Sequence, residues 1–447
     1  MIQVQPPDSF LQKILGQQEM TRGEDYRLLS FCISLPVPEG MLICNNLTKE
    51  VLFFPESEPA SSPHLLETLV RKWFYVPISM NDRNLFDQIL SIAKMSSKPK
   101  DKSFTILTTT ACNARCFYCF EKGTPAYDMS VETAHDVVAY IQSVYQEGSF
   151  MRLHWFGGEP LCNPEAIDII CSQLKASGIP FSSQMTTNGF LLSEDMAVRA
   201  AGRWNLQSVQ ITLDGTEDVY NRAKAYIYPD TNAYQTVMNN LSHLKENGIS
   251  LSIRLNADRY NVNNLHELVD ELGRLFPDPS SVYIGIAPLL EHAGAFPIVR
   301  DEESRASLFN SLKELLYHIE GLGFATGRGL SKTIRTGCCE ADSPHSIVIM
   351  PDGSLRRCQH IKTGSIVGSV KDMNPSLGVG MWTSYRKPLP ECDLCPFYPS
   401  CFRLTDCEES VSCSSALRNW KTEQIYALLR RIWKKFKKNC STGIENS

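Results

Sequence analysis

The chain has 447 residues, of which 43% are hydrophobic and 21% are charged, and its net charge is -5 at pH 7. These values predict a globular protein of two or three packed domains and argue against a general nucleic-acid-binding protein, which is normally basic over a whole domain. The N-terminal residues hold no cationic segment followed by an apolar one, and no stretch reaches about 18 uninterrupted apolar residues, so we expect a cytoplasmic protein without a membrane span.

Residues 1–95 read as a small separate domain. FCISL, beginning at Phe31, and EVLFF, beginning at Glu50, flank a stretch rich in turn residues, which predicts a β-hairpin or three short strands. A helix is expected to begin at Pro63, where apolar residues start to recur at helical spacing, and a second helix fits the apolar residues from Leu85 to Leu90. A hairpin followed by helices predicts a winged-helix-like domain.

From residue 104 the pattern changes to strand, loop and helix, repeated about six times. The expected strands are 104–109, 152–156, 182–187, 208–213, 251–257 and 282–287. Such alternation predicts a parallel sheet with helices outside it, either a doubly wound sheet or a barrel. Small or polar residues follow five successive strands, and the C-terminal ends of parallel strands converge at the active site, which favours the barrel. Six repeats leave the barrel open on one side, and an open side suits a large substrate.

The loop after the first of these strands carries Cys112, Cys116 and Cys119 at CxxxCxxC spacing. Sixteen cysteines in a reducing compartment indicate metal or redox chemistry rather than disulfides. Three thiolates can hold a 4Fe-4S cluster by three irons and leave the fourth iron open. The alternatives are a zinc site completed by a distant residue, or three buried thiols. The loop has no histidine nearby, so we favour the cluster.

The spacing of these cysteines, with the aromatic Tyr118 beside the last of them, resembles the radical S-adenosylmethionine (SAM) superfamily. The resemblance implies that the open iron binds the amine and carboxylate of SAM. It also implies that reductive cleavage of SAM yields a 5'-deoxyadenosyl radical, which abstracts a hydrogen atom from the substrate. The electron would come from a donor such as flavodoxin or ferredoxin, and the protein mainly positions cofactor and substrate.

Two further motifs extend the resemblance. GGEP, at Gly157, would be an ordinary turn if it stood alone, but after the second strand it resembles the stretch that meets the SAM amine. ITLDG resembles an SxDG segment, although Thr212 replaces the serine and Tyr220 the histidine that usually follows. Lys224 stands where an arginine for the SAM carboxylate is expected, and a lysine is not equivalent there. The SAM contacts implied by the resemblance are Tyr118, Gly157, Gly158, Glu159, Asn188, Thr212 and Lys224, with Arg254 as the alternative to Lys224.

A second group of cysteines follows a predicted helical bridge. It consists of Cys338, Cys339, Cys358, Cys392, Cys395, Cys401, Cys407 and Cys413. Two structural zinc sites would explain eight thiols. The spacing, however, resembles the SPASM domain, which carries auxiliary 4Fe-4S clusters in radical SAM enzymes.

The SPASM resemblance implies two auxiliary clusters. One is expected on Cys392, Cys395, Cys401 and Cys413, and the other on Cys338 or Cys339 together with Cys358 and Cys407. Two departures stand out: five residues separate Cys401 from Cys407 where the family has three, and two adjacent cysteines do not both reach one cluster. One iron would then stay open or be bound by His360 or by substrate, although we favour the interpretation of His360 as an ordinary loop histidine.

The last segment predicts a basic amphipathic helix, with Trp420, Trp433 and Phe436 on its apolar face. Such a helix either lies on an acidic membrane or partner, or closes a core, and we favour the core.

The resemblance covers nearly the whole chain. It implies an α/β protein: a partial (β/α)6 TIM-like radical SAM barrel with a small winged-helix-like domain before it and a cysteine-rich SPASM domain after it. The expected domains are 1–95 for peptide recognition, 104–300 for the radical SAM core, 301–335 for the helical bridge, 336–416 for the auxiliary clusters and 417–447 for the basic helix.

This combination most resembles the maturases of ribosomally made peptides (RiPPs), in which the N-terminal domain adds the leader of the substrate peptide to its sheet as a strand. Simple packing of that domain against the core is the alternative. We favour formation of a thioether or carbon-carbon crosslink in the peptide.

Two other functions remain open. One is an anaerobic sulfatase-maturating, formylglycine-forming enzyme, although the aspartate that this family places after the equivalent of Cys358 is Gln359 here. The other is a non-catalytic, metal-stabilised peptide carrier, although a pseudo-enzyme would usually have lost one of the three loop cysteines.

Overall fold

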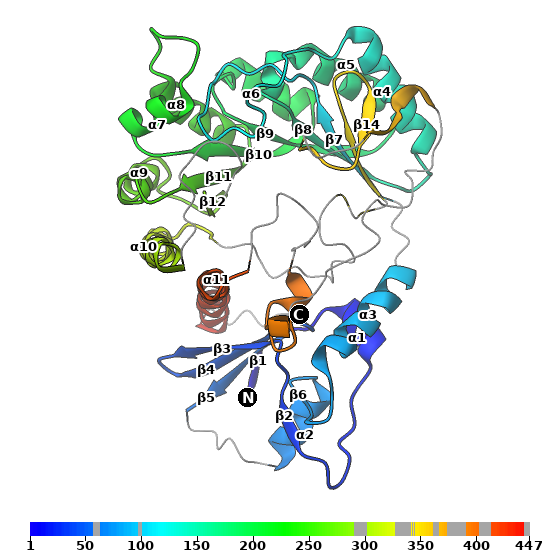
Figure 1. Ribbon diagram of the computed structural model, residues 1–447, viewed down its shortest axis with the longest axis vertical. Coiled ribbons are helices and arrows are strands. Elements are labelled where there is room, and N and C mark those ends of the chain that lie inside the picture. Colours follow the sequence, from blue (N-terminus) through cyan, green and yellow to red (C-terminus); the bar gives the residue numbers. More distant parts are fainter. Residues whose placement is uncertain are drawn as a thin grey trace.

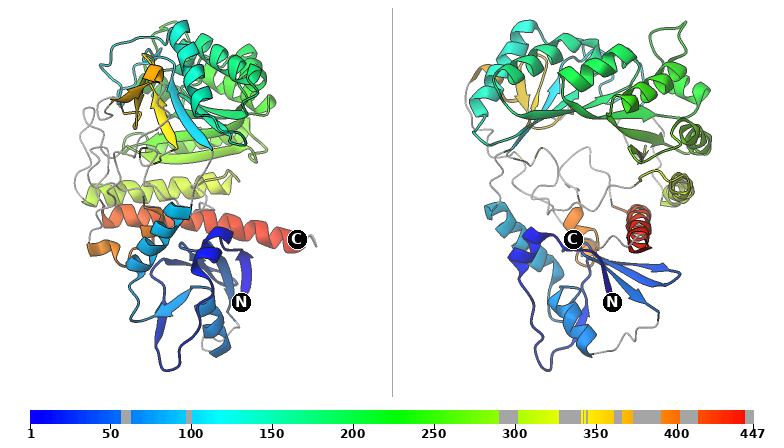
Figure 2. Two further views of the ribbon diagram at one scale, coloured as in Figure 1. Left: turned by 90° about the vertical axis from the view of Figure 1, so that its right-hand side faces the viewer. Right: turned by 180° about the vertical axis from the view of Figure 1, so that it is seen from behind.

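The computed structural model describes residues 1–56, 63–96, 101–289, 302–326, 341, 343, 345–360, 366–372, 390–401 and 413–441. A core of parallel strands and helices lies at one end of the molecule, and an N-terminal unit, residues 1–96, lies at the other (Figure 1). Helices α10, Glu302–Gly321, and α11, Ser415–Ser441, run between these two parts (Figure 2).

Six adjacent parallel strands, β7 to β12, form the centre of the core sheet. They are β7 Lys102–Leu107, β8 Met151–Phe156, β9 Phe181–Thr187, β10 Leu206–Leu213, β11 Ser250–Ala257 and β12 Val282–Pro288. The helices between them are α4 Val131–Val144, α5 Pro164–Ala176, α6 Glu194–Arg203, α7 Glu217–Lys224, α8 Ala233–Glu246 and α9 Val262–Leu275. The predicted α/β fold with its strands in this order is confirmed.

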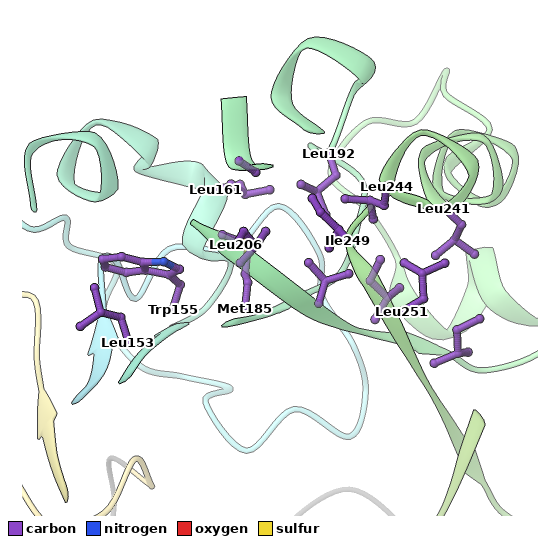
Figure 3. Close-up of a cluster of buried hydrophobic side chains, with 14 of the residues drawn as sticks. Leu153, Trp155, Leu161, Met185, Leu192, Leu206, Leu241, Leu244, Ile249 and Leu251 are labelled. Atoms are coloured by element: carbon purple, nitrogen blue, oxygen red, sulfur yellow. The ribbon is translucent and has the colours of Figure 1, made fainter. Parts of the chain in front are cut away.

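Apolar residues at alternate strand positions explain why the helices lie on one face of this sheet. Leu153 and Trp155 of β8 are fully buried against them, whereas His154 points to the other face. Figure 3 shows Trp155 and Met185 from the strands in the same layer as Leu241 from α8. The period of two along each strand therefore fixes which side chains meet the helices.

The opposite side of the core sheet, which we call the inner face, is largely polar. Its strand register places His154 beside Gln184, Thr186 beside Gln210, and Thr212 beside Arg254. The inner-face positions of β7 to β12 are Ser103, Thr105, Leu107, Arg152, His154, Phe156, Ser182, Gln184, Thr186, Ser208, Gln210, Thr212, Ser250, Ser252, Arg254, Asn256, Tyr283, Gly285 and Ala287.

Three short strands from the C-terminal part of the chain extend this sheet beyond β7. Strand β13, Ser346–Ile349, pairs in parallel with β7, and β14, Ser354–Arg356, and β15, Ile366–Ser369, follow it in antiparallel order. The β13–β14 turn needs a glycine, because Gly353 has a φ of +80° and its N–H donates to Met350 O at 2.9 Å. Part of the cysteine-rich segment is therefore built onto the core sheet.

The N-terminal unit holds a four-stranded antiparallel sheet in the order β1-β5-β4-β3. Its strands are β1 Ile2–Gln5, β3 Cys32–Val37, β4 Gly40–Asn45 and β5 Val51–Pro55, and a separate pair is formed by β2 Tyr26–Leu28 and β6 Tyr75–Pro77. Its helices are α1 Ser9–Leu15, α2 Pro63–Arg71 and α3 Asp82–Ser96. The strands and both helices expected in this region are present.

Helix α11 packs on both the N-terminal sheet and helix α10. Its Trp433 lies against Phe53 of β5, with ring centroids 4.3 Å apart, and its Trp420 stacks on Phe309 of α10 at 5.9 Å. The expectation that this helix closes a core is confirmed. None of the helices in the described parts of the chain is both long and apolar enough to cross a membrane.

Candidate active site

The cysteine loop, residues 108–128, follows β7 and is held by main-chain hydrogen bonds on both sides. Thr110 N–H donates to Tyr127 O at 3.0 Å and closes the loop on itself. Arg115 N–H donates to Lys224 O at 2.8 Å, and Ile227 N–H donates to Asn113 O at 3.0 Å. The loop is therefore fixed to the segment that follows α7.

The three thiols of this loop are each partly buried. Burial raises the pKa of Cys112 to about 12, and it also raises the pKa of Cys119. A thiol of raised pKa becomes a thiolate at neutral pH only when a metal replaces its proton, which a bound iron would do. The N–H of Ala114 already points at Cys112 Sγ, 3.4 Å away.

Within the described ranges, no three Cys, His, Asp or Glu side chains form a group suited to a single metal ion. A four-iron cluster sets a different requirement, because each thiolate binds its own iron and the ligands surround a volume instead of meeting at a point. The three-cysteine loop fits such a cluster by its donor chemistry.

The two glycines of GGEP pack directly against the cysteine loop. A Cβ atom on Gly157 would lie 2.2 Å from Thr109 O, and one on Gly158 would lie 2.3 Å from Ala111 O. Gly157 also has a φ of +134°. Any larger residue here would push the loop away from the end of β8.

Glu159 of the same motif is fully buried, and its carboxylate accepts hydrogen bonds from neighbouring residues. Its carboxylate accepts hydrogen bonds from Leu161 N–H at 3.1 Å, Thr187 Oγ1 at 2.8 Å and Asn188 N–H at 2.8 Å. Burial raises its pKa. Glu159 therefore holds Asn188 in place at the end of β9.

Asn188 in turn fixes an amide of the cysteine loop. Its Nδ2 donates to Asn113 Oδ1 at 2.7 Å. The Nδ2 of Asn113 is buried and has no hydrogen-bond partner among the described residues. A buried donor without a partner is costly, so this atom fits a polar ligand such as the amino acid part of SAM.

Tyr118, Asp214 and Lys224 form a buried polar cluster under the loop. Tyr118 OH donates to Asp214 Oδ2 at 3.0 Å, and Lys224 Nζ lies 2.9 Å from Tyr118 OH and 3.2 Å from Asp214 Oδ2. The side chains of Lys224 and Asp214 are only 4% and 3% exposed. The lysine predicted to meet SAM is thus already paired with a carboxylate.

The predicted SAM contacts fall into two groups. Tyr118 lies in the cysteine loop, and the GGEP residues, Asn188 and Lys224 lie next to this loop. Thr212 and Arg254 lie opposite each other on β10 and β11, where Arg254 Nε donates to Asn256 Oδ1 at 3.0 Å. Asn113 and Asp214 are not among the site residues predicted from the sequence, although Asn113 lies in the cysteine loop and Asp214 in the ITLDG segment.

Three of the C-terminal cysteines border a cavity of about 390 Å³. Cys392, Cys395 and Cys413 line it together with Arg418, whose Nη1 lies 3.7 Å from Cys413 Sγ. Cys401 does not line this cavity, and its Sγ lies 4.0 Å from Lys421 Nζ. The cavity thus brings together three of the four cysteines predicted to hold one auxiliary cluster. Cys338, Cys339 and Cys407 lie outside the described residues, and of the other predicted set only Cys358 lies inside them.

The loop that carries Cys392 and Cys395 packs on the N-terminal unit. Tyr398 stacks on Phe31 with ring centroids 6.3 Å apart, and its hydroxyl donates to Asp87 Oδ1 at 3.1 Å. Asn46 Nδ2 donates to Pro396 O at 2.7 Å. The first and last parts of the chain thus share one packed interface.

His154, on the inner face, gives the fold a testable pH dependence. Its Nε2 lies 2.9 Å from Thr186 Oγ1, and burial lowers its pKa to about 4. The unfolded chain takes up this proton near the ordinary pKa of about 6.5 and therefore binds more protons between pH 6.5 and pH 4. The free energy of unfolding should fall over this range as the pH falls, by at most about 3 kcal/mol from this residue.

Urea unfolding of a His154→Gln variant at several pH values checks this expectation. The glutamine keeps a hydrogen-bonding group beside Thr186, and the slope between pH 4 and pH 6.5 should become shallower. The exposed His64, replaced in the same way, serves as the control and should leave the slope unchanged. Equal slopes in the wild type and His154→Gln would contradict the prediction.

In a comparison with known protein families, residues 106–272 match the sequence model of the Radical SAM superfamily. GTP 3',8-cyclase from Crocosphaera subtropica is 29% identical over 126 residues, which make up 27% of this chain and 37% of that protein. S-adenosylmethionine-dependent nucleotide dehydratase from Psychrobacter lutiphocae is 23% identical over 198 residues, 41% of this chain and 64% of that protein. The chain thus spans less than two thirds of the length of these curated relatives.

A solved structure described as native anSMEcpe with bound AdoMet has a similar fold. Its TM-score is 0.57 at 15% identity, and the match covers 75% of this chain and 99% of that chain. The structure of the same protein with bound AdoMet and Cp18Cys peptide has a TM-score of 0.56 at 16% identity, with the same coverage. These values establish a shared fold.

Proposed function

Because residues 106–272 match the sequence model of the Radical SAM superfamily, we propose that this chain cleaves SAM reductively and modifies a peptide with the resulting radical. The 4Fe-4S cluster and SAM, when bound, supply the electron and the 5'-deoxyadenosyl radical. Cys112, Cys116 and Cys119 hold the cluster. Asn113, aligned by Asn188, offers its free amide to the bound SAM.

The small number of basic side chains on the inner face is our reason for proposing a peptide substrate instead of a nucleotide. A nucleoside triphosphate brings about four negative charges, and proteins meet such charge with several Arg or Lys side chains or a metal ion. At the inner-face positions of β7 to β12 the basic side chains are Arg152 and Arg254, with His154 kept neutral by burial. Arg152 already pairs with Asp101 at 2.9 Å.

The other inner-face positions suit a peptide better. Hydroxyl and amide side chains, such as Thr186, Gln210 and Thr212, both donate and accept hydrogen bonds. A peptide backbone presents the same two kinds of group at every residue. The anSMEcpe structure, which has a similar fold, has been solved with a peptide bound, and this supports the same substrate class here.

The N-terminal unit is proposed to hold the leader of the peptide. Strand β3 lies at one edge of its sheet and contains Pro36, a residue that edge strands tolerate. Addition of an extended peptide to such an edge is a recurrent mode of recognition. No second strand of the described residues pairs with this edge of β3, which therefore offers a place for the leader.

The modification is proposed to be an oxidative crosslink, either a thioether or a carbon-carbon bond. Its formation removes two hydrogens from the peptide: one leaves as a hydrogen atom, and the other leaves as a proton with its electron passed on. An auxiliary cluster on Cys392, Cys395, Cys401 and Cys413 would accept that electron. Three of these thiols, Cys392, Cys395 and Cys413, line one cavity, which supports this assignment.

Mass spectrometry of anaerobic reactions tests the proposal. The reconstituted full chain is mixed with SAM, dithionite and, in separate reactions, each short peptide encoded beside its gene. A peptide that loses two hydrogens per event while 5'-deoxyadenosine accumulates would support crosslinking. Conversion of GTP, assayed in parallel, with every peptide left unchanged would overturn the peptide assignment. Absence of 5'-deoxyadenosine under all conditions would overturn the enzymatic role.

A further inference from the structure

Lys224 occupies the sequence position of a SAM ligand but lies in a buried site of its own. Its ammonium contacts Asp214 at 3.2 Å and Tyr118 OH at 2.9 Å, and 4% of its side chain is exposed. An ammonium buried to this degree needs a paired anion nearby, because desolvation of an isolated charge is costly. Asp214 supplies that anion.

The cluster of Tyr118, Asp214 and Lys224 connects three separate segments of the core. Tyr118 lies in the cysteine loop between Cys116 and Cys119, Asp214 follows β10, and Lys224 ends α7. Lys224 also accepts a hydrogen bond from Arg115 N–H through its carbonyl oxygen, at 2.8 Å. The same residue thus holds the loop by both its side chain and its backbone.

The positive charge of Lys224 also lies close to the thiols of the loop. Its ammonium is 5.6 Å from the centre of the Tyr118 ring, and Tyr118 stands in the chain between Cys116 and Cys119. A charge that favours thiolates also favours added electrons on the metal that they hold. Net charge and hydrogen bonding near a cluster are known determinants of its reduction potential.

We propose that Lys224 is a positioning residue, which fixes the cysteine loop through Tyr118 and Asp214 and raises the reduction potential of the loop cluster, and that it does not bind the carboxylate of SAM. The proposal rests on the proposed function only for the presence of the cluster. It predicts an effect in protein that contains no SAM.

The test compares Lys224→Met with wild type as reconstituted full-length protein. The midpoint potential of the loop cluster is measured without SAM by electron paramagnetic resonance, and the loop cluster is recognised as the signal that later changes on adding SAM. We expect a more negative midpoint and an altered signal in the variant. The Kd for SAM should change by less than about threefold, which is well under the tenfold that one strong contact represents. Lys175→Met, on the exposed side of α5, serves as the matched control and should leave both measurements unchanged.

An unchanged midpoint together with a Kd weakened by about tenfold or more would overturn the proposal and assign Lys224 to SAM. If Lys224→Met loads too little iron to be measured, the Lys224→Met/Asp214→Asn double variant replaces the ion pair with neutral groups. Recovery of iron by the double variant, again with little change in Kd, would support the positioning role. No recovery would overturn the role assigned to the pair. A failure of the proposed function would appear separately, as an absence of 5'-deoxyadenosine from the wild type.

Discussion

Replacing Cys112, Cys116 and Cys119 together by alanine is expected to remove about four irons per chain and to abolish production of 5'-deoxyadenosine. The physical reason is that the change removes all three proposed protein ligands of the loop cluster, so SAM has no site from which to receive an electron. Iron, sulfide and zinc are counted in anaerobically purified protein, and 5'-deoxyadenosine is measured after reduction with dithionite. Wild type with three clusters should hold about twelve irons and the variant about eight.

The matched control is the triple change of Cys392, Cys395 and Cys413 to alanine, which removes three proposed ligands of the auxiliary cluster near α11. This variant should also lose about four irons, yet it should still produce 5'-deoxyadenosine, because the loop cluster remains. A wild-type content of four irons and two zincs would be consistent with SAM cleavage at the loop cluster. It would also indicate that the C-terminal cysteines bind structural zinc. That result would remove the electron acceptor on which the oxidative crosslink depends.

Replacing Trp433 by alanine is expected to lower the free energy of unfolding by about 3–5 kcal/mol, the usual cost of removing a large buried aromatic side chain. Trp433 is 7% exposed and lies between Phe53 of the N-terminal sheet and Phe436 of its own helix. The change should leave a cavity between α11 and that sheet. Urea unfolding, monitored by circular dichroism, measures the loss.

Lys435→Ala is the control for this prediction, since Lys435 is exposed two residues further along the same helix. It should change the free energy of unfolding by less than about 0.5 kcal/mol. A loss of similar size in both variants would mean that the helix as a whole is perturbed. A negligible loss in Trp433→Ala would contradict the packing of α11 on the N-terminal sheet.

The parallel strands of the core could be predicted from sequence because their pattern is local. The core-facing positions of these strands are mainly apolar and alternate with polar ones, as Leu251, Ile253 and Leu255 do in β11. The same alternation identifies the residues of the inner face. That this face carries few charged side chains becomes clear only when the six strands are known to lie side by side. The CxxxCxxC spacing of the loop cysteines likewise predicted that they hold a cluster.

Other features depend on contacts between distant residues, which no local pattern records. Lys224 matched a motif by its spacing, but its burial with Asp214 and Tyr118 depends on how α7 meets the cysteine loop. The pairing of β13 with β7 joins residues more than two hundred positions apart. A strand as short as Ser346–Ile349 gives little indication of its partner.

The packing of α11 on the N-terminal sheet also has a consequence for how the protein is made. Leu429 and Trp433 complete the apolar core around Leu42 and Phe53, so the first hundred residues leave the ribosome without the last part of their own core. A chain grows at about 5–20 residues per second, so this sheet waits for tens of seconds with an uncovered apolar surface. During that interval it is a natural target for a chaperone, and the final helix ends the exposure when it is released.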